Sequence, residues 1–169
     1  MAKKEVKTDL WVYELLQEAN IQLTPQGCDI IEIDEALKSA SKSKTGNAGY
    51  PEYCGVVNDF IVVIEDKASL DKHIYKDDNG LLSQEVKAVK DYAVNGALFY
   101  ALHLAANTSY NKVLAFGISG NERHHRITPI FVNERGDYQE LSDVETFISF
   151  NNANINEYYV KEILVDDKN

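Results

Sequence analysis

The sequence predicts an α/β domain in which helices flank a mixed central sheet. Helical and strand patterns follow one another in the order α-α-β-β-α-β-β-α, which is typical of one sheet covered by helices. Residues 60–64 read Phe-Ile-Val-Val-Ile, an apolar run that suits a strand buried on both faces. Residues 84–106 have the spacing of a long helix whose small side chains can pack closely on a sheet. The 169 residues are enough for one domain with a substantial core.

Two amphipathic helices are expected before the sheet. Residues 9–20 place their apolar side chains on one face, and Thr8 or Asp9 can cap this helix. Residues 29–40 show the same pattern, with Asp29 as N-cap. A polar Ser/Lys/Gly/Asn loop then leads to the sheet.

A β-hairpin is expected next. Residues 53–57 and the apolar run 60–64 form its strands, and Asn58-Asp59 forms a two-residue turn. This loop length pairs Val57 with Phe60. Counting outward from that pair sets Glu52 opposite Glu65.

Charged residues end the hairpin abruptly with Glu65-Asp66-Lys67. Along a strand, Glu65 and Lys67 point to one side and Asp66 to the other. The opposed carboxylates of Glu52 and Glu65 repel, and a metal ion or a proton between them relieves the repulsion. Two carboxylates with a lysine two residues on suit a divalent cation and a phosphate.

The second half of the chain predicts the rest of one domain. We expect a core over residues 8–150, with a C-terminal extension over 151–169 that frays from about Asp166. The expected elements are a polar loop or flap at 71–83, the long helix 84–106, strands at 112–119 and 127–132, and a helix capped by Ser142 that ends near Phe150.

The charge pattern neither requires nor excludes a nucleic-acid partner. The net charge of −10 argues against binding DNA by electrostatics alone. Lys38, Lys42 and Lys44 nevertheless lie in a stretch, residues 36–51, that contains no acid. Such patches suit a nuclease module that relies on other domains for most of its DNA affinity, and they equally suit a mixed surface with no such role.

A Pro-Glu pair before one strand and a Glu-x-Lys triplet at the end of the next resemble the motif of the PD-(D/E)xK nuclease superfamily. The likeness covers about residues 10–135. It resembles the N-terminal nuclease region of type I restriction R subunits and of restriction-associated N6-adenine DNA methylases. The stretches that carry it are residues 35–42, 49–53, 65–73, 91–101 and 115–120. The chain departs from the pattern by having Glu52 for the commoner Asp and Asp66 inside the triplet.

This resemblance implies a restriction-endonuclease-like fold and a metal-dependent DNA endonuclease of a restriction-modification system. It implies Mg²⁺ as cofactor, with Mn²⁺ able to substitute, held by Glu52, Glu65 and the backbone carbonyl of Asp66. Lys67 then stabilises the transition state or orients the attacking water. Glu14 is a further candidate ligand from the first helix, although a solvated helix face is the favoured explanation of this residue.

Other residues are candidates for DNA contacts. Lys72 and His73 follow the triplet and can touch phosphate, or they can belong to a solvated loop. The resemblance also places a polar residue and a tyrosine of the long helix near the site, and Asn95 and Tyr100 are the nearest equivalents. Tyr100 can stack on a base, although core packing is the simpler explanation at its helical spacing.

Two other functions remain open from the sequence. One is a nuclease-fold module without cutting activity that binds DNA or a partner protein. The other is an acidic interaction protein, which requires Glu52 and Glu65 to lie far apart. A P-loop and an Asn-Pro-Pro motif are both absent from the sequence. Motor, methylase or specificity components are therefore expected as further domains or subunits, with this chain as the N-terminal part of a larger protein and double-stranded DNA as substrate.

The location expected from the sequence is the cytoplasm. The chain has no apolar run long enough for a membrane span, and its start lacks the apolar region of a signal peptide, so no membrane partner is expected. Cys28 and Cys54 lack the spacing of a metal site, and Cys54 suits a small buried side chain in a strand.

Overall fold

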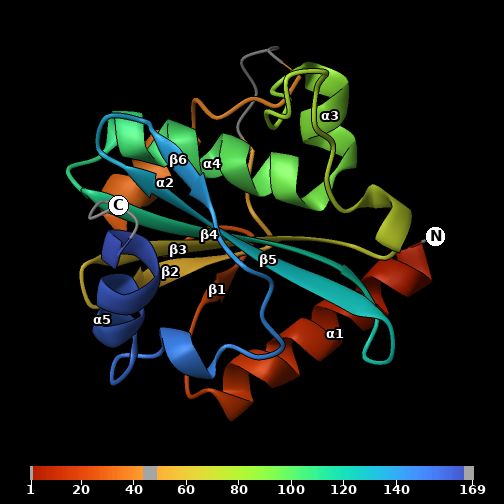
Figure 1. Ribbon diagram of the computed structural model, residues 1–169, viewed down its shortest axis with the longest axis horizontal. Coiled ribbons are helices and arrows are strands. Elements are labelled where there is room, and N and C mark those ends of the chain that lie inside the picture. Colours follow the sequence, from red (N-terminus) through yellow and green to blue (C-terminus); the bar gives the residue numbers. More distant parts are fainter. Residues whose placement is uncertain (1, 44–48, 166–169) are drawn as a thin grey trace.

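The computed structural model describes residues 2–43 and 49–165, and within them six strands form one sheet in the order β1-β2-β3-β4-β5-β6 (Figure 1). Strands β3 and β4 run parallel, and every other neighbouring pair is antiparallel. The strands are β1 (Thr24–Pro25), β2 (Tyr53–Val57), β3 (Phe60–Lys67), β4 (Lys112–Gly120), β5 (His125–Asn133) and β6 (Tyr138–Glu140). This mixed sheet between helices confirms the predicted fold class and is compatible with a restriction-endonuclease-like architecture.

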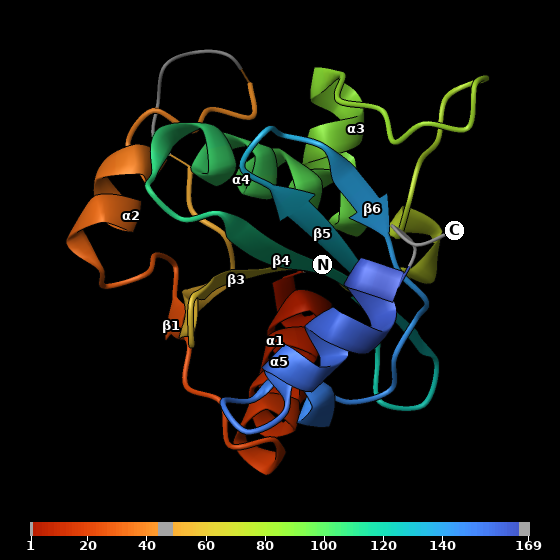
Figure 2. The same cartoon turned by 60° about the vertical axis from the view of Figure 1, so that its left-hand side comes forward.

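Helices cover both faces of the sheet (Figures 1 and 2). One face carries α2 (Ile31–Leu37), α3 (Val86–Asp91) and α4 (Ala93–Asn107), and the other carries α1 (Ala2–Glu18) and α5 (Ile155–Tyr158). Three further turns of helix are η1 (Leu70–Lys72), η2 (Ile148–Phe150) and η3 (Tyr159–Ile163). Among the described residues, no helix combines the length and apolar character needed to cross a membrane.

The two faces of strand β3 fill two separate hydrophobic cores. Val62 and Ile64 pack in the core beneath α1, and Ile61 and Val63 pack in the core beneath α4. All four side chains are buried. Burial on both faces of the strand explains why this run is apolar throughout instead of alternating with polar residues. Ile155 and Ile163, near the C-terminus, also belong to the core beneath α1.

The hairpin has the predicted register. Val57 pairs with Phe60, and Tyr53 pairs with Ile64, on either side of the Asn58-Asp59 turn. Asn58 takes a φ of 53°, a conformation that asparagine tolerates better than most residues. The predicted strands β4 and β5 are confirmed as well, and both extend slightly further than expected.

The first two helices begin elsewhere than predicted. Helix α1 begins at Ala2, so Thr8 lies inside it and donates a hydrogen bond to the Gly120 carbonyl at 2.9 Å. Asp29 does not cap α2, because its φ of 64° places it in the preceding turn and Ile30 occupies the N-cap position. Most of the predicted 41–49 loop lies outside the described residues.

The long helix predicted over 84–106 is two helices. Tyr92 has an extended backbone between α3 and α4. This break allows the Val94 amide to donate to the His73 carbonyl at 2.8 Å. It also brings Val94 so close to strand β4 that a Cβ on Gly117 would lie 2.5 Å from the Val94 Cα. The glycine at this position thus permits the close helix–sheet packing that the small residues predicted.

The helix predicted from Ser142 to Phe150 is wrong apart from the short turn η2. The segment runs beside β5, where the Leu141 amide donates to the Pro129 carbonyl at 3.0 Å and the Val144 amide to the Ile127 carbonyl at 2.9 Å. These two bonds hold the backbone of residues 141–144 against β5 rather than in a helix. The polar loop predicted at 71–83 is confirmed, with a turn at Asp77–Gly80.

Candidate active site

The end of strand β3 carries three consecutive charged residues at the edge between the two cores. Glu65 and Asp66 are each only 4% exposed, and Lys67 is half-buried. Since side chains alternate along a strand, Glu65 and Lys67 follow Val63 toward α4, and Asp66 follows Ile64 toward α1. The triplet therefore presents different chemistry on the two faces of the sheet.

On the α4 face, the carboxylate of Glu65 is held from two directions. Its Oε2 forms an ion pair with Lys42, which follows α2 in the chain. Its Oε1 accepts a hydrogen bond from the backbone amide of Glu52 at 3.2 Å. Glu52 and Glu65 are thus neighbours, as the hairpin register predicted. A buried carboxylate without such partners would be costly, so these two contacts stabilise Glu65 in its buried position.

Helix α4 closes this face of the site with Gly96 and Tyr100. A Cβ at Gly96 would lie 3.2 Å from Glu65 Oε2 and 2.9 Å from the Val89 carbonyl, so a larger residue there would crowd the carboxylate. Tyr100 is buried, and the Lys42 ammonium lies 5.0 Å from the centre of its ring. Burial, and then the charges of Glu65 and Glu52, raise the Tyr100 pKa well above its usual value, so this phenol stays neutral.

Glu52 is positioned by the chain just after β1. The Gln26 amide donates to the Glu52 carbonyl at 3.1 Å, and the Gln26 side chain donates to Glu52 Oε2 at 2.9 Å. This fixes Glu52 immediately before strand β2, beside the end of β3. From there its carboxylate also reaches the acidic group on the other face.

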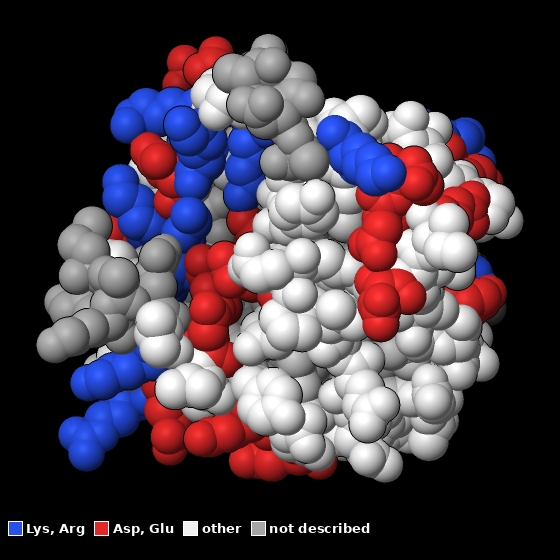
Figure 3. Space-filling view, turned by 180° about the vertical axis from the view of Figure 1, so that it is seen from behind, with Lys and Arg blue, Asp and Glu red and all other residues white. Residues whose placement is uncertain are grey.

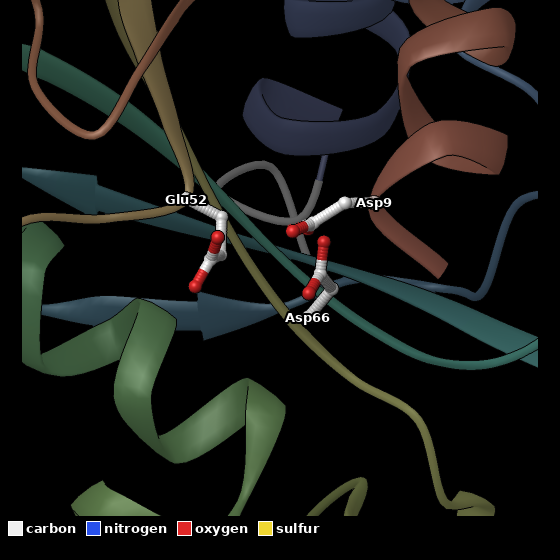
Figure 4. Close-up of side chains that lie close together, drawn as sticks. All are labelled: Asp9, Glu52 and Asp66. Carbon is white, nitrogen blue, oxygen red and sulfur yellow. The ribbon is translucent and has the colours of Figure 1, made fainter. Parts of the chain in front are cut away.

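On the α1 face, Asp9 and Asp66 point their carboxyl groups at one another, with Glu52 beside them (Figure 4). One oxygen of each of these three residues lies within 4.8 Å of the others. Burial is the main cause that raises the pKa of Asp66 to about 10, and the Asp9 carboxyl adds to it through a hydrogen bond and its charge. Glu52 and Glu65 raise it further. The group therefore needs a proton or a cation.

Asp9 is the acid that α1 brings to this site, whereas the sequence pattern had predicted only a helix cap at this position. Its spacing carried the signal, because Asp9 lies one turn before Val12 and two turns before Leu16 on the apolar stripe of the helix. The predicted candidate, Glu14, is exposed and is not part of the three-carboxyl group. Helix α1 is anchored here by the Tyr53 hydroxyl, which donates to the Asp9 carbonyl at 3.1 Å. Burial, followed by the charge of Asp9, raises the pKa of Tyr53 to about 12.

His73 is a core residue, which corrects the expectation that it touches phosphate. It is 2% exposed, and its ring nitrogens bond to Ser119 Oγ at 2.6 Å and Thr128 Oγ1 at 2.7 Å. Thr128 already donates its proton to Asp143, so it accepts from His73 Nε2, and Nδ1 accepts from Ser119. Burial, followed by the positive charge of Arg126, lowers the His73 pKa to about 4.

Asn95 and Tyr100, the two candidate residues of the predicted long helix, are both buried. Asn95 is buried and holds the loop after η1, because its side chain bonds to both backbone polar groups of Tyr75 and to the Ser83 carbonyl. Tyr100 is too buried to stack on a base, although it does lie beside the carboxylates. Cys28 and Cys54 are both buried and unbridged, as expected for Cys54.

The predicted DNA-contacting lysines differ in their surroundings. Lys38 is exposed and forms an ion pair with Glu35 at 3.0 Å, Lys42 binds Glu65, and Lys44 lies outside the described residues. Lys72 is exposed, and its ammonium lies 5.4 Å from the centre of the Tyr92 ring.

A group of lysines that includes Lys67 of the triplet lies around Asp91 of α3. The ion pair with Lys87 is the main cause that lowers the Asp91 pKa, and the charges of Lys72 and Lys67 lower it further. We call Lys67, Lys72 and Lys87 the lysine strip. Figure 3 shows basic side chains gathered on the side of the molecule that carries α3, with acidic side chains directly next to them.

Comparison with known proteins gives one informative likeness. The chain is 35% identical over 166 residues to the type II restriction enzyme and methyltransferase RM.BcgI of Heyndrickxia coagulans, a match that covers 97% of this chain. It spans only 26% of the length of that relative. No family model and no solved structure matches. Along almost its whole length, the chain is therefore similar to about a quarter of a restriction-modification protein.

Proposed function

We propose that this chain is the metal-dependent DNA endonuclease domain of a restriction-modification system. The observation that carries the proposal is the contact between Glu52 and Glu65 at the end of β3, where the Glu52 amide lies 3.2 Å from Glu65 Oε1. Lys67 follows on the same face of the strand as Glu65. The likeness to a restriction enzyme and methyltransferase supports this reading.

Glu52, Glu65 and the backbone carbonyl of Asp66 are the residues that would hold Mg²⁺. These are the hard oxygen donors that Mg²⁺ prefers, and two carboxylates leave room for the waters that it keeps. When bound, Mg²⁺ neutralises charge on the phosphate and lowers the pKa of a water molecule. A cation bound here would also offset the negative charge of the buried Glu65 carboxylate.

Lys67 acts as the electrostatic partner of the phosphate. Its place two residues after Glu65 puts its stem on the α4 face, where its ammonium can stabilise the charge that develops on the phosphoryl oxygens. Lys42 holds Glu65 in this structure and has to release one carboxylate oxygen when an ion binds. Tyr100, a neutral phenol, then closes the site from the side of α4.

The DNA backbone would follow the lysine strip. Lys72 and Lys87 are exposed and lie around Asp91 together with Lys67 of the triplet, so they can contact phosphates on one side of the cleaved bond. With a net charge of −10, the chain derives little DNA affinity from its overall field. Further domains or subunits, such as the methylase, specificity or motor parts of such systems, would then supply most of the affinity and the sequence recognition.

Cleavage of supercoiled plasmid at low ionic strength, with Mg²⁺ or Mn²⁺, tests this proposal. We expect the wild-type chain to nick or linearise the plasmid, and Glu65→Gln to reduce the rate at least about 100-fold. Glu122→Gln is the matched control, because Glu122 is an exposed acid in the β4–β5 turn. If the wild-type chain binds the plasmid but does not cut it with either ion, the chain is a nuclease-fold module that only binds DNA.

A further inference from the structure

The α1 face of strand β3 carries a carboxyl pair that the proposed nuclease mechanism does not use. The side chains of Asp9 and Asp66 lie across the sheet from Glu65 and Lys67, and they point at one another (Figure 4). The proposed mechanism uses only the backbone carbonyl of Asp66. A strand position that faces an apolar core normally carries an aliphatic side chain, as positions 62 and 64 do. The aspartate at position 66 on the same face therefore requires an explanation.

The second observation is an unsatisfied buried oxygen. Asp66 is 4% exposed, and its Oδ2 has no hydrogen-bond partner. The buried Oδ1 of Asp9 has none either, so a hydrogen bond between the two carboxyl groups requires a proton shared by them. Neither carboxylate forms an ion pair with a lysine or arginine among the side chains that the structure describes, residues 6–43 and 49–165. Because buried polar atoms are nearly always partnered, two oxygens without partners on carboxyl groups that face each other indicate that a proton or a cation lies between them.

We propose that Asp9, Asp66 and Glu52 form a second binding site, for a hard divalent cation, on the α1 face of strand β3. The donor set consists only of carboxylate oxygens, which suit Ca²⁺, Mn²⁺ or Mg²⁺ rather than softer metals. Glu52 is common to this site and to the Glu52–Glu65 site, and Asp9 with the Asp66 side chain distinguishes it.

The spacing of the oxygens fits a single ion. One oxygen from each residue lies within 4.8 Å of the others. Two oxygens on opposite sides of a Ca²⁺ ion are separated by about 4.6–5.2 Å, and on opposite sides of Mg²⁺ by about 4.0–4.2 Å. A cation of calcium's size can therefore span any separation up to this limit without movement of the ligands.

The site would join three separate elements of the fold. Asp9 comes from α1, Glu52 from the chain before β2, and Asp66 from β3. An ion there would fix α1 to the end of the hairpin, beside the Tyr53 hydroxyl that already binds the Asp9 carbonyl. It would also hold Glu52 in place for the other face. Ion binding at this site can be measured without a cleavage assay, because all three proposed ligands belong to this chain.

Calorimetric titration of the 169-residue chain with Ca²⁺ and, separately, Mn²⁺ tests the site. The variants are Asp66→Asn and Asp9→Asn, which keep the side-chain shape and remove a charge, and Glu65→Gln is the control. We expect the wild type and Glu65→Gln to share one binding event that is lost, or weakened at least tenfold, in Asp66→Asn and Asp9→Asn. Wild-type stoichiometry and affinity in both aspartate variants would overturn the proposal, and so would a wild type that binds neither ion. In those cases a shared proton occupies the pair.

Thermal unfolding separates loss of the ion from loss of the fold. In EDTA we expect Asp66→Asn to unfold near the wild-type temperature, because the asparagine amide can donate to Asp9 in place of the proton that the buried Asp66 carboxyl otherwise holds. Added Ca²⁺ should then raise the Tm of the wild type and of Glu65→Gln, on the order of 5 °C at 100-fold excess over Kd, and leave Asp66→Asn unchanged. An equal Ca²⁺-dependent rise in all three proteins would count against the site. Failure of the nuclease proposal gives a different pattern, in which Glu65→Gln keeps every binding event and no protein cuts DNA.

Discussion

The backbone amide of Glu52 donates to the side-chain Oε1 of Glu65 across 3.2 Å. This bond ties the residue before β2 to the end of β3, so the hairpin register sets the geometry of the site directly. Because Oε2 of the same carboxylate pairs with Lys42, Glu65 is oriented before any ion arrives. Preorganised ligands of this kind are worth more than ligands that must be ordered on binding.

Replacement of Lys67 should remove cleavage and keep the fold. Loss of one electrostatic stabiliser of a transition state costs about 100- to 1,000-fold in rate, so we expect Lys67→Ala to reduce plasmid cleavage by that factor. The side chain is half-buried at a strand end, so its loss should change the Tm little. Lys90→Ala, an exposed lysine of α3, is the matched control. Cleavage at the wild-type rate by Lys67→Ala would reject the role assigned to this lysine.

Replacement of Lys42 should make stability depend on metal. Glu65 is 4% exposed, and Lys42→Met leaves its carboxylate with the Glu52 amide as its remaining described partner. We therefore expect Lys42→Met to lower the free energy of unfolding in EDTA by about 1–3 kcal/mol, because a charge loses its partner in a buried place. Since Lys42 competes with a cation for Glu65, the variant should also bind Mn²⁺ several-fold more tightly.

Chemical denaturation with and without Mn²⁺ checks this prediction. The ion should restore most of the lost stability in Lys42→Met and do so less in the wild type. Lys38→Met, which breaks an exposed pair with Glu35, is the control and should behave as wild type. A variant that is destabilised equally in EDTA and in Mn²⁺ would show that Lys42 does not compete with metal for Glu65.

The lysine strip should control the salt dependence of DNA binding. Removal of one lysine–phosphate interaction lowers the slope of log K against log salt by about one, so Lys72→Ala and Lys87→Ala should each reduce it by about that amount. The change should be the same for duplexes of different sequence, because phosphate contacts carry no sequence information. Fluorescence anisotropy in EDTA gives the slopes without cleavage. Lys161→Ala, on η3 and paired with Glu157, should leave the slope unchanged. An equal slope in all four proteins would place the DNA elsewhere on the surface.

Local patterns in the sequence were sufficient to predict the hairpin and the meeting of its two glutamates. The apolar run before Glu65 predicted a strand, and the two-residue Asn58-Asp59 turn predicted its register with the preceding strand. The same local reasoning supports the buried strands β4 and β5. In each case the signal and the structure that it determines lie within a few residues of each other.

Contacts between distant segments explain what the sequence did not predict. Asp9 was assigned as a helix cap, but α1 begins seven residues before it, and only its partner Asp66 makes it part of a site. The sequence predicts a loop position for His73, whereas in the structure Ser119 and Thr128 form hydrogen bonds with the two nitrogens of its ring. The sequence predicts a DNA contact for Lys42, and the structure adds an ion pair with Glu65 that the sequence did not predict. Propensity and periodicity contain no information on such pairings, which depend on tertiary packing.

His73 should make the protein less stable as the pH falls from about 6.5 to 4. The unfolded chain protonates this histidine near its ordinary pKa of about 6.5. The folded protein protonates it only near its lowered pKa of about 4, because the ring is buried near Arg126. Between these values the unfolded state binds more protons, so the free energy of unfolding decreases with decreasing pH, by about 3 kcal/mol across the window. Asp143, which faces the same group, offsets part of the effect of Arg126.

Comparison with His73→Gln isolates this contribution, because other groups such as Asp66 titrate in both proteins. Glutamine can still bond to Ser119 or Thr128 and carries no titrating proton. Urea unfolding of both proteins between pH 4 and 8 gives two stability curves. Their difference should be constant above about pH 7 and shrink steadily below pH 6.5, as the wild type loses the stability that its neutral histidine provides. A difference that stays constant down to pH 4 would mean that His73 accepts a proton in the folded protein as readily as in the unfolded chain, and the buried hydrogen-bonded ring would then have to open to water.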